Sequence, residues 1–406
     1  MELKTKYQYS NFIYPYIIEE AKYTNYILKL LKDKKCKIKF FEKEKDYNIY
    51  SYFLPVIRKF VFNDFEFTKT KIEKFNELET KMQASILSKY NSIIFEYELG
   101  ENTQAKLGEE EGIFFNIQKI EIICFNTGIC FLCIKTNLEN TEKFADILDF
   151  NYKFKNIMSD LKQYDKIKIQ TNKFKNSKEF ETIINDITAG KQDNLSINSE
   201  QLLVYSYTCI DQENWNTEES FKGLENEFLK YVNVLESSYK SNLDKNIKQD
   251  SIDKLKYAKV GITKTSTALI ASNIETENYT KLPFKYENEY LYTYIFCLYQ
   301  KMYLKKILEE SKNKNKATLR KQFINFTNKI WIQEITEDDS GSELYKMWQE
   351  ELETEKLFLE AKNKFDILYK EENLEKNNKI NKVILTALIV SLIMNIVNFI
   401  ILFNLE

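Results

Sequence analysis

The last segment of the chain constrains its fold more than any other. Residues 383–403 read VILTALIVSLIMNIVNFIILF and contain no charged side chain. At a helical rise of about 1.5 Å per residue, a run of this length covers roughly 30 Å, which matches the hydrocarbon core of a bilayer. Few buried helices of soluble domains are this uniformly apolar. The run therefore predicts a transmembrane helix at 383–403.

Polar residues in and just before this run lie on one face of the predicted helix. They belong to a heptad seam, with spacings that alternate between three and four residues, formed by Asn381, Ile384, Leu388, Ser391, Asn395, Asn398 and Leu402. Asparagine is costly in hydrocarbon unless its amide meets a partner or water, so we expect this polar seam to face other copies of the helix. It either lines a hydrated pore or only holds a dimer together. Thr386 lies off the seam, and its hydroxyl can bond a carbonyl one turn earlier.

Charges that flank the apolar run indicate its orientation. Lys376, Lys379 and Lys382 precede it, whereas only residues 404–406, Asn-Leu-Glu, follow it. The positive-inside rule places the chain before the run in the cytoplasm and the C-terminus outside. Residues 1–9 have no apolar core of a signal peptide. We therefore expect a single-pass protein with a cytoplasmic N-terminal domain and with membrane lipid around its last helix.

The composition argues against several functional classes. The chain has 59 Lys and Arg against 61 Asp and Glu, so no excess positive charge favours direct binding of nucleic acid. Histidine is absent, which removes the commonest general base near neutral pH and the commonest transition-metal ligand. Its eight glycines form no phosphate-binding loop. We expect no enzyme activity, no catalytic residues and no bound cofactor.

Six cysteines in a cytosolic chain are expected to be reduced. Cys130 and Cys133 have the spacing of a metal or redox motif, but they lie in the apolar run ICFLCIKT. Residues three apart in a strand point to opposite faces of the sheet. We therefore predict that both pack in the core, and we expect no metal site.

The first 282 residues predict an α+β cytosolic domain of αβα type. Strand-like runs SIIFEYEL, IFFNIQKIEIICF and ICFLCIKT lie between residues 92 and 136, and helical patterns flank them. The turn at 126–128, Asn-Thr-Gly, predicts a hairpin with glycine at a positive φ. Pro15 would confine a first strand at 7–20 to an edge of the sheet, or end it. With further strands at 202–210 and 257–272, these runs predict a mixed sheet of about five to seven strands.

The chain is predicted to be helical from residue 283 onward. Connecting helices are expected within 283–341, and the first of them, within 286–308, is apolar on all sides but too short to span a membrane, which is typical of a buried helix. Ser340 and Glu343 match a capping box. No glycine or proline follows Gly341. We therefore predict one uninterrupted helix from about 342 to 403, with a stalk at 342–382 and the membrane span at 383–403.

The predicted stalk changes character along its length. Apolar residues typical of a coiled coil occupy heptad positions at Leu344, Met347, Phe358, Ala361, Phe365 and Leu368. From Lys370 to Lys382 the sequence KEENLEKNNKINK is polar on every side, which excludes a dry coiled coil. This part is expected to line a hydrated vestibule, or to act as a hinge or a frayed collar.

The order of these elements resembles the CorA family of divalent-cation channels, in which an αβα cytosolic domain and two connecting helices lead into a very long helix that enters the bilayer. Residues 286–398 resemble the family most, and IEIICFNTGICFLCIKT is similar to a sheet hairpin of divergent CorA-like proteins, including those encoded beside type III CRISPR systems. The family's first membrane helix lines the pore and ends in Gly-Met-Asn. Here Met394 and Asn395 follow Ile393 inside the apolar run, and the family's second membrane helix and its loop are missing.

The resemblance implies a homo-oligomer, a pentamer in that family, in the inner or cell membrane of a bacterium. It implies a channel gated by a ligand of the cytosolic domain, with a divalent cation as the candidate permeant ion. The CRISPR-associated branch implies an antiviral effector that responds to a nucleotide second messenger, although the sequence itself shows no nucleotide site. The alternative is a single-pass scaffold or receptor without conductance. An anchored hydrolase would need a carboxylate or cysteine site that the sequence does not show.

Overall fold

A computed structural model describes most of the chain, namely residues 3–99, 103–108, 112–139, 142–157, 167–171, 174–192, 201–217, 219–240, 249–250, 256–311 and 316–403. The chain forms two compact units. We call Met1–Tyr303 with Trp331–Thr354 the sheet unit, and Leu304–Ile330 with Glu355–Glu406 the helical unit. These units do not follow the four predicted segments, because residues 283–303 and 331–341 belong to the sheet unit.

The sheet unit is built on one mixed β-sheet, to which the described residues contribute twelve strands. The strands follow the order β10-β11-β12-β9-β1-β6-β5-β4-β7-β8, and β3 pairs with both β2 and β5. β9 and β12 run parallel, and the other pairs are antiparallel. The strands are β1 Thr5–Ile17, β2 Cys36–Ile38, β3 Ser92–Tyr97, β4 Gln104–Leu107, β5 Ile113–Phe125, β6 Ile129–Leu138, β7 Ile167–Thr171, β8 Phe174–Glu179, β9 Leu203–Ile210, β10 Gln249–Asp250, β11 Ala258–Ile262 and β12 Ser266–Ser272.

The first strand lies inside the sheet, between β6 and β9. Of the two alternatives predicted from Pro15, an edge position or the end of the strand, the edge position is therefore wrong. The pairing of β1 with β9 ends at Ile13, so Pro15 lies beyond the last residue paired on that side. The N–H of Ile18 donates to Gly128 on the β6 side, and alternate residues of a strand point the same way. The nitrogen of Pro15 therefore faces the unpaired side. A proline is tolerated here because it interrupts no ladder between described strands.

The predicted hairpin between β5 and β6 is confirmed. The two strands pair antiparallel over most of their length, and Gly128 in the turn has a φ of +83°. A Cβ atom at Gly128 would lie 2.0 Å from the carbonyl oxygen of Ile18. The turn therefore needs glycine both for its left-handed backbone and for space. Cys130 and Cys133 are buried on β6 as free thiols, in agreement with the predicted core packing.

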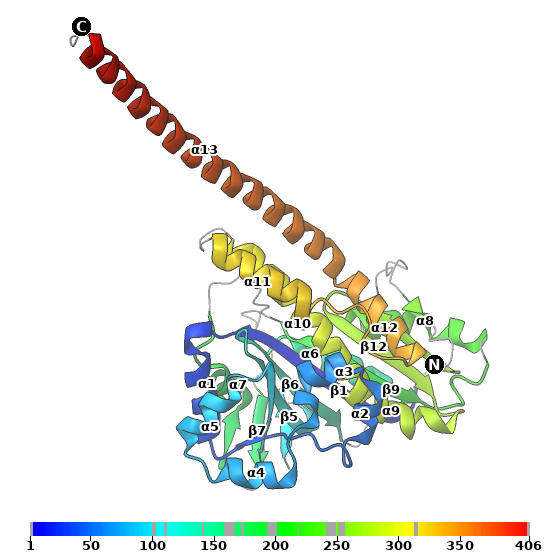
Figure 1. Cartoon of the computed structure of the whole chain (residues 1–406). Coiled ribbons are helices and arrows are strands. Elements are labelled where there is room, and N and C mark those ends of the chain that lie inside the picture. Colours follow the sequence, from blue (N-terminus) through cyan, green and yellow to red (C-terminus); the bar gives the residue numbers. More distant parts are fainter. Residues whose placement is uncertain are drawn as a thin grey trace. The chain divides into compact units, whose positions relative to one another are not determined.

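Helices cover both faces of the sheet, as predicted for an αβα domain (Figure 1). On one face, the ring of Phe12 in β1 stacks on Phe154 of α6 at 4.1 Å. The hydroxyls of Tyr16 and Tyr26 meet at 2.6 Å and join β1 to α1. The helices that contribute to this core are α1 Tyr23–Lys32, α5 Thr80–Leu87, α6 Phe144–Lys155, α7 Phe180–Thr188 and α8 Glu225–Asn233.

The other face of the sheet is covered by helices from the N-terminal and the C-terminal parts of the sheet unit's sequence. Tyr299 of α10 stacks on Phe125 of β5 at 3.9 Å. The indole of Trp348 in α12 donates a hydrogen bond of 3.0 Å to the hydroxyl of Thr267 in β12. The remaining helices of this unit are α2 Tyr47–Tyr52, α3 Pro55–Val61, α9 Lys281–Lys285 and α12 Asp339–Glu351, together with α4 Lys69–Asn76, whose Phe75 belongs to the core on the first face.

The buried helix predicted near 286–308 is confirmed as α10, Leu291–Glu310, which a π-helical turn at Tyr286–Tyr290 precedes. Every residue from 291 to 300 is buried. This part of α10 has no solvent-facing side, because the sheet and the neighbouring helices surround the helix.

The predicted uninterrupted helix from 342 to 403 is wrong, because it is broken near Leu352. α12 ends at Glu351, Glu353 has a φ of +55°, and α13 begins at Thr354. Leu352 and Thr354 are both buried, and the hydroxyl of Thr354 bonds the carbonyl of Gln349 at 3.0 Å. Burial of these two neighbours outweighs the cost of about 1–2 kcal/mol for a left-handed residue that is not glycine.

The N-terminus of α12 also differs from the prediction. α12 begins at Asp339, and the carboxylate of Asp338 accepts a hydrogen bond of 2.8 Å from the N–H of Gly341. Asp338 is therefore the N-cap, and Ser340 lies inside the first turn. The predicted capping box of Ser340 and Glu343 is placed two residues too late.

The helical unit contains α11, Lys316–Lys329, and α13, Thr354–Phe403. Figure 1 shows α13 as one unbroken helix. The continuity of the predicted stalk with the apolar run is therefore confirmed from Thr354 onward. Phe323 of α11 stacks on Phe365 of α13 at 4.7 Å. The guanidinium of Arg320 lies 4.6 Å from the ring centroid of Tyr369.

The heptad residues of the predicted stalk have partners within this chain. Leu344 and Met347 lie in α12 and are buried in the sheet unit. Phe358 and Phe365 contact α11, and Ala361 between them is fully buried. The pattern is typical of a coiled coil, but these apolar positions are packed against helices of the same chain. Leu368 is half-buried.

Candidate functional site

The predicted polar seam lies on α13. Six of its seven residues are helical and exposed, namely Asn381, Ile384, Leu388, Ser391, Asn395 and Asn398. The seventh, Leu402, lies within the helix, but its side chain is outside the described part of the chain. The hydroxyl of Thr386 donates to the carbonyl of Lys382 at 2.9 Å, as predicted for this off-seam threonine. The structure thus shows the helix that carries the seam, and the six described seam side chains are exposed along it.

α13 is the one helix, among the residues that the structure describes, that is long and apolar enough to cross a membrane. Its apolar part has no burial within the chain. A shallow groove along it contains three of the seam residues and the small residues beside them, and it is lined by Lys382, Val383, Thr386, Ala387, Val390, Ser391, Met394, Asn395 and Asn398. Small and polar side chains therefore gather along one side of the helix.

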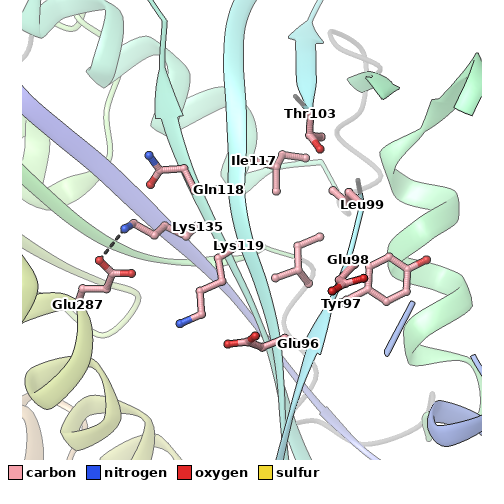
Figure 2. Close-up of a pocket in the computed structure, with 11 residues that line it drawn as sticks. Glu96, Tyr97, Glu98, Leu99, Thr103, Ile117, Gln118, Lys119, Lys135 and Glu287 are labelled. Carbon is pink, nitrogen blue, oxygen red and sulfur yellow. Dashed lines mark hydrogen bonds and ion pairs between the residues drawn. The ribbon is translucent and has the colours of Figure 1, made fainter. Parts of the chain in front are cut away.

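A second candidate site lies in the sheet unit, at a gap along one edge of β5 (Figure 2). β3 pairs with β5 as far as Glu96, and β4 resumes the pairing at Gln104. Residues 117–120 of β5 have no partner strand on this edge among the described residues. The gap opens a cavity of about 800 Å³, lined by Glu96, Tyr97, Glu98, Leu99, Thr103, Ile117, Gln118, Lys119, Ile120, Lys135 and Glu287. We call it the sheet-edge pocket.

A β-bulge determines which side chains line this pocket. The register of β5 against β6 shifts between Ile117 and Lys119, so Gln118 is the extra residue. Ile117 and Ile120 consequently face the same apolar core although they are three residues apart. Figure 2 shows Gln118 and Lys119 together on the other side of the strand. The bulge thus brings two polar side chains to the face of the sheet that α10 covers.

Glu121 joins the wall of the pocket to α10 through a buried ion network. Its carboxylate accepts hydrogen bonds from Lys39 at 2.9 Å and from the hydroxyl of Tyr292 at 3.2 Å, and Lys119 lies 2.8 Å away. Burial opposes ionisation of this carboxyl, which is 4% exposed, but the two ammonium groups outweigh burial and lower the pKa of Glu121 to about 2. Glu121 is therefore ionised at neutral pH.

A second ion pair connects the pocket with the turn before α10. The ammonium of Lys135 on β6 lies 2.6 Å from the carboxylate of Glu287 in the π-helical turn, and both are drawn in Figure 2. The same ammonium lies 4.7 Å from the ring centroid of Tyr9. Lys135 is also the cross-strand partner of Lys119. Two lysines of neighbouring strands thus stand opposite each other, and each is neutralised by a different carboxylate.

Sequence reasoning left the ligand-binding residues unknown and did not find this pocket. The one local signal is the polar pair Gln118 and Lys119, which interrupts the alternation of IFFNIQKIEIICF. The other charged groups come from β3, β6 and the turn before α10. Among the described residues, no group of three or more acidic or cysteine side chains is placed to hold a metal ion.

Comparisons with protein-family models, with curated proteins and with solved structures gave no match.

Proposed function

We propose that this protein is a single-pass membrane protein whose α13 helices associate along the polar seam and form a ligand-gated pore, in the manner of a CorA-like channel. One observation carries the proposal, which is the exposed polar seam within the apolar part of α13. The resemblance to CorA proteins suggests a ring of copies, a divalent cation as the permeant ion and a role in antiviral defence.

The exposed apolar surface of α13 supports insertion into a membrane. Val383 is 70% exposed, and Leu388 and Met394 are each 62% exposed. Soluble proteins rarely expose an apolar surface of this extent, which marks contact with lipid or with another protein. The lysines at 376, 379 and 382 support a cytoplasmic position of the sheet unit by the positive-inside rule.

The seam supports association of several copies. Asn395 and Asn398 would each lose hydrogen bonds to water on entering hydrocarbon. Packing of seams around a common axis gives the amides partners or water. Ser391, Asn395 and Asn398 then form polar rings, whereas Ile384, Leu388 and Leu402 form apolar constrictions that exclude water in the closed state.

A single-pass scaffold or receptor without conductance is the second candidate. It is favoured by the packing of α11 on Phe358 and Phe365, because these residues are not available for a coiled coil between copies. Association then depends on the apolar part of α13 alone, and a dimer held by Asn395 would satisfy the seam.

The first prediction separates the two candidates by two substitutions in the seam. In the channel, Leu388→Asn hydrates a constriction, so ion flux into liposomes without ligand should rise about tenfold or more. Asn395→Leu should reduce the flux and leave the mass of the assembly unchanged. Ile393→Asn is the matched control, because it lies about 200° from Ser391 and Asn395 at about 100° per residue, and it should not increase flux.

The scaffold gives the opposite pattern in the same measurements. Asn395→Leu would weaken association, as seen in the detergent-corrected mass, and Leu388→Asn would not change ion flux. A monomer at every concentration of the wild-type protein would contradict both candidates.

A further inference from the structure

We propose that the sheet-edge pocket binds a small anion, through a carboxylate or phosphate group held by Lys119 and Lys135, and that this anion competes with Glu287 for Lys135. The inference deepens the proposed function by naming the class of the gating ligand. It rests on that function only in the step from binding to gating.

The two lysines form a charge arrangement that an anion would relieve. Lys119 and Lys135 are directly opposite each other on β5 and β6. Like charges at such positions destabilise a sheet. Their side chains are only 26% and 12% exposed, so water screens the repulsion incompletely. An anion between two ammonium groups gains charge-assisted hydrogen bonds from both.

The partners of the two lysines differ in how readily they can be replaced. Lys119 bonds Glu121, which is buried and also held by Lys39 and Tyr292. Lys135 forms its ion pair with Glu287, and Glu287 belongs to a turn and not to the sheet. An incoming anion therefore displaces Glu287, and the network around Glu121 stays in place.

The charge balance of the pocket limits the ligand to a small anion. Glu98 at the mouth pairs with Lys37 at 2.5 Å, and Glu96 lies 3.6 Å from Lys39, so these carboxylates are already neutralised. An anion that replaces Glu287 at Lys135 leaves the balance unchanged. A long polyanion would bring further negative charges next to Glu96 and Glu98, whose lysine partners are already engaged. The cavity of about 800 Å³ is within the range of small-molecule sites.

Displacement of Glu287 would act on α10. Glu287 lies in the π-helical turn Tyr286–Tyr290, which leads directly into α10. π-helical turns inside helices occur frequently at functional sites. α10 begins in the sheet unit, and its residues 304–310 belong to the helical unit. The turn that carries the pocket's replaceable partner thus leads into a helix whose last residues belong to the helical unit.

The second prediction concerns binding by the full chain in detergent, measured by titration calorimetry at low salt. The probes are inorganic phosphate, citrate and adenosine monophosphate, with adenosine as an uncharged control. A free anion and a nucleotide are distinguished by whether phosphate alone or only the monophosphate binds. Lys135→Gln and Lys119→Gln should each weaken binding about tenfold or more, because each removes a charge-assisted hydrogen bond. Lys135→Arg should retain most of the affinity.

The decisive variant is Glu287→Gln, which should tighten binding about tenfold because the competing carboxylate is removed. A purely structural role of the Lys135–Glu287 pair predicts lower thermal stability and no gain in affinity. Glu227→Gln and Lys230→Gln, an ion pair of 2.9 Å near α8 on the opposite face of the sheet, are the matched controls and should leave anion affinity unchanged. Calorimetry is interpreted only for variants with the circular dichroism of the wild type.

Two results would overturn the inference, namely no anion binding to the wild-type protein at millimolar concentrations, or weaker binding after Glu287→Gln. Liposome flux is a separate readout. Binding without flux would leave the pocket assigned and contradict the channel, whereas anion-independent flux without binding would leave the channel and contradict the pocket.

Discussion

At the scale of single residues, Glu121 shows how this chain holds a carboxylate in its interior. Lys39, Lys119 and Tyr292 all contact its Oε1 atom, and they come from three separate parts of the sequence. Removal of one member of a buried ion network leaves an unpaired charge, which costs more than the intact network contributes.

The third prediction is that Glu121→Gln lowers the free energy of unfolding by about 3–5 kcal/mol at pH 7, because two lysines lose their common partner. The measurement is chemical unfolding of the full chain, followed by a signal of the sheet unit. Glu98→Gln is the control, because its ion pair with Lys37 is exposed and should contribute about 1 kcal/mol or less. Equal effects of the two substitutions would contradict the buried network.

The same carboxyl makes stability depend on pH. Its pKa in the folded state is about 2, below the value of about 4.3 for a glutamate in an unfolded chain. The folded state therefore binds fewer protons in this range, and the stabilisation is present above about pH 4.3 and is lost as pH falls towards 2. Glu121→Gln should flatten the loss of stability over this range.

At the scale of elements, α11 packs against the heptad positions of α13. Phe326 of α11 is fully buried, and its ring lies 6.4 Å from that of Phe358 on α13. Lys316 and Glu371 form an ion pair of 3.5 Å between the same two helices. Beyond residue 373, every described side chain of α13 is exposed.

The fourth prediction is that Phe326→Ala loosens this helix pair without affecting the sheet unit. The loss of a buried ring costs about 3–5 kcal/mol, so amide exchange should accelerate strongly in α11 and in residues 354–371 of α13. Exchange in β5 and β6 should not change. Ile324→Ala, at an exposed position of α11, is the control, and comparable acceleration in that variant would contradict the assigned packing.

At the scale of the whole molecule, the core of the sheet unit is formed separately from the apolar end of α13. The core of the sheet unit contains its own strands and helices, and α13 beyond residue 373 contributes nothing to it. Insolubility of the full chain in water is therefore expected to come from the apolar end of α13 and not from the sheet unit.

The fifth prediction is that a chain ending at Glu375 is soluble and folded without detergent. This fragment keeps the stacking of Phe323 on Phe365 and the ion pair of Lys316 with Glu371. A chain ending at Glu353 is the comparison, because it leaves Phe326 without its partners on α13 and should aggregate. Sedimentation and circular dichroism measure both, and aggregation of the longer fragment would contradict the division.

Features set by short-range periodicity and backbone sterics were determined by the sequence alone. The apolar run, the turn at Gly128 and the apolar helix α10 were predicted where the structure has them, because each depends on neighbouring residues and on the geometry of one element. The polar seam belongs to this group as a pattern, since a helix at 383–403 presents those residues on one side. What the seam contacts remains a prediction.

Choices between partners were decided only by the tertiary structure. The heptad pattern through Phe358 and Phe365 suits another copy as well as α11, and only the sum of all contacts selects between them. The break at Glu353 has no local glycine or proline signal, and Leu352 and Thr354 on either side of it are buried. Glu121 lies 82 residues from Lys39 and 171 from Tyr292 along the chain. Periodicity gives no information on such pairings, since they depend on strand register and on which helix covers the sheet.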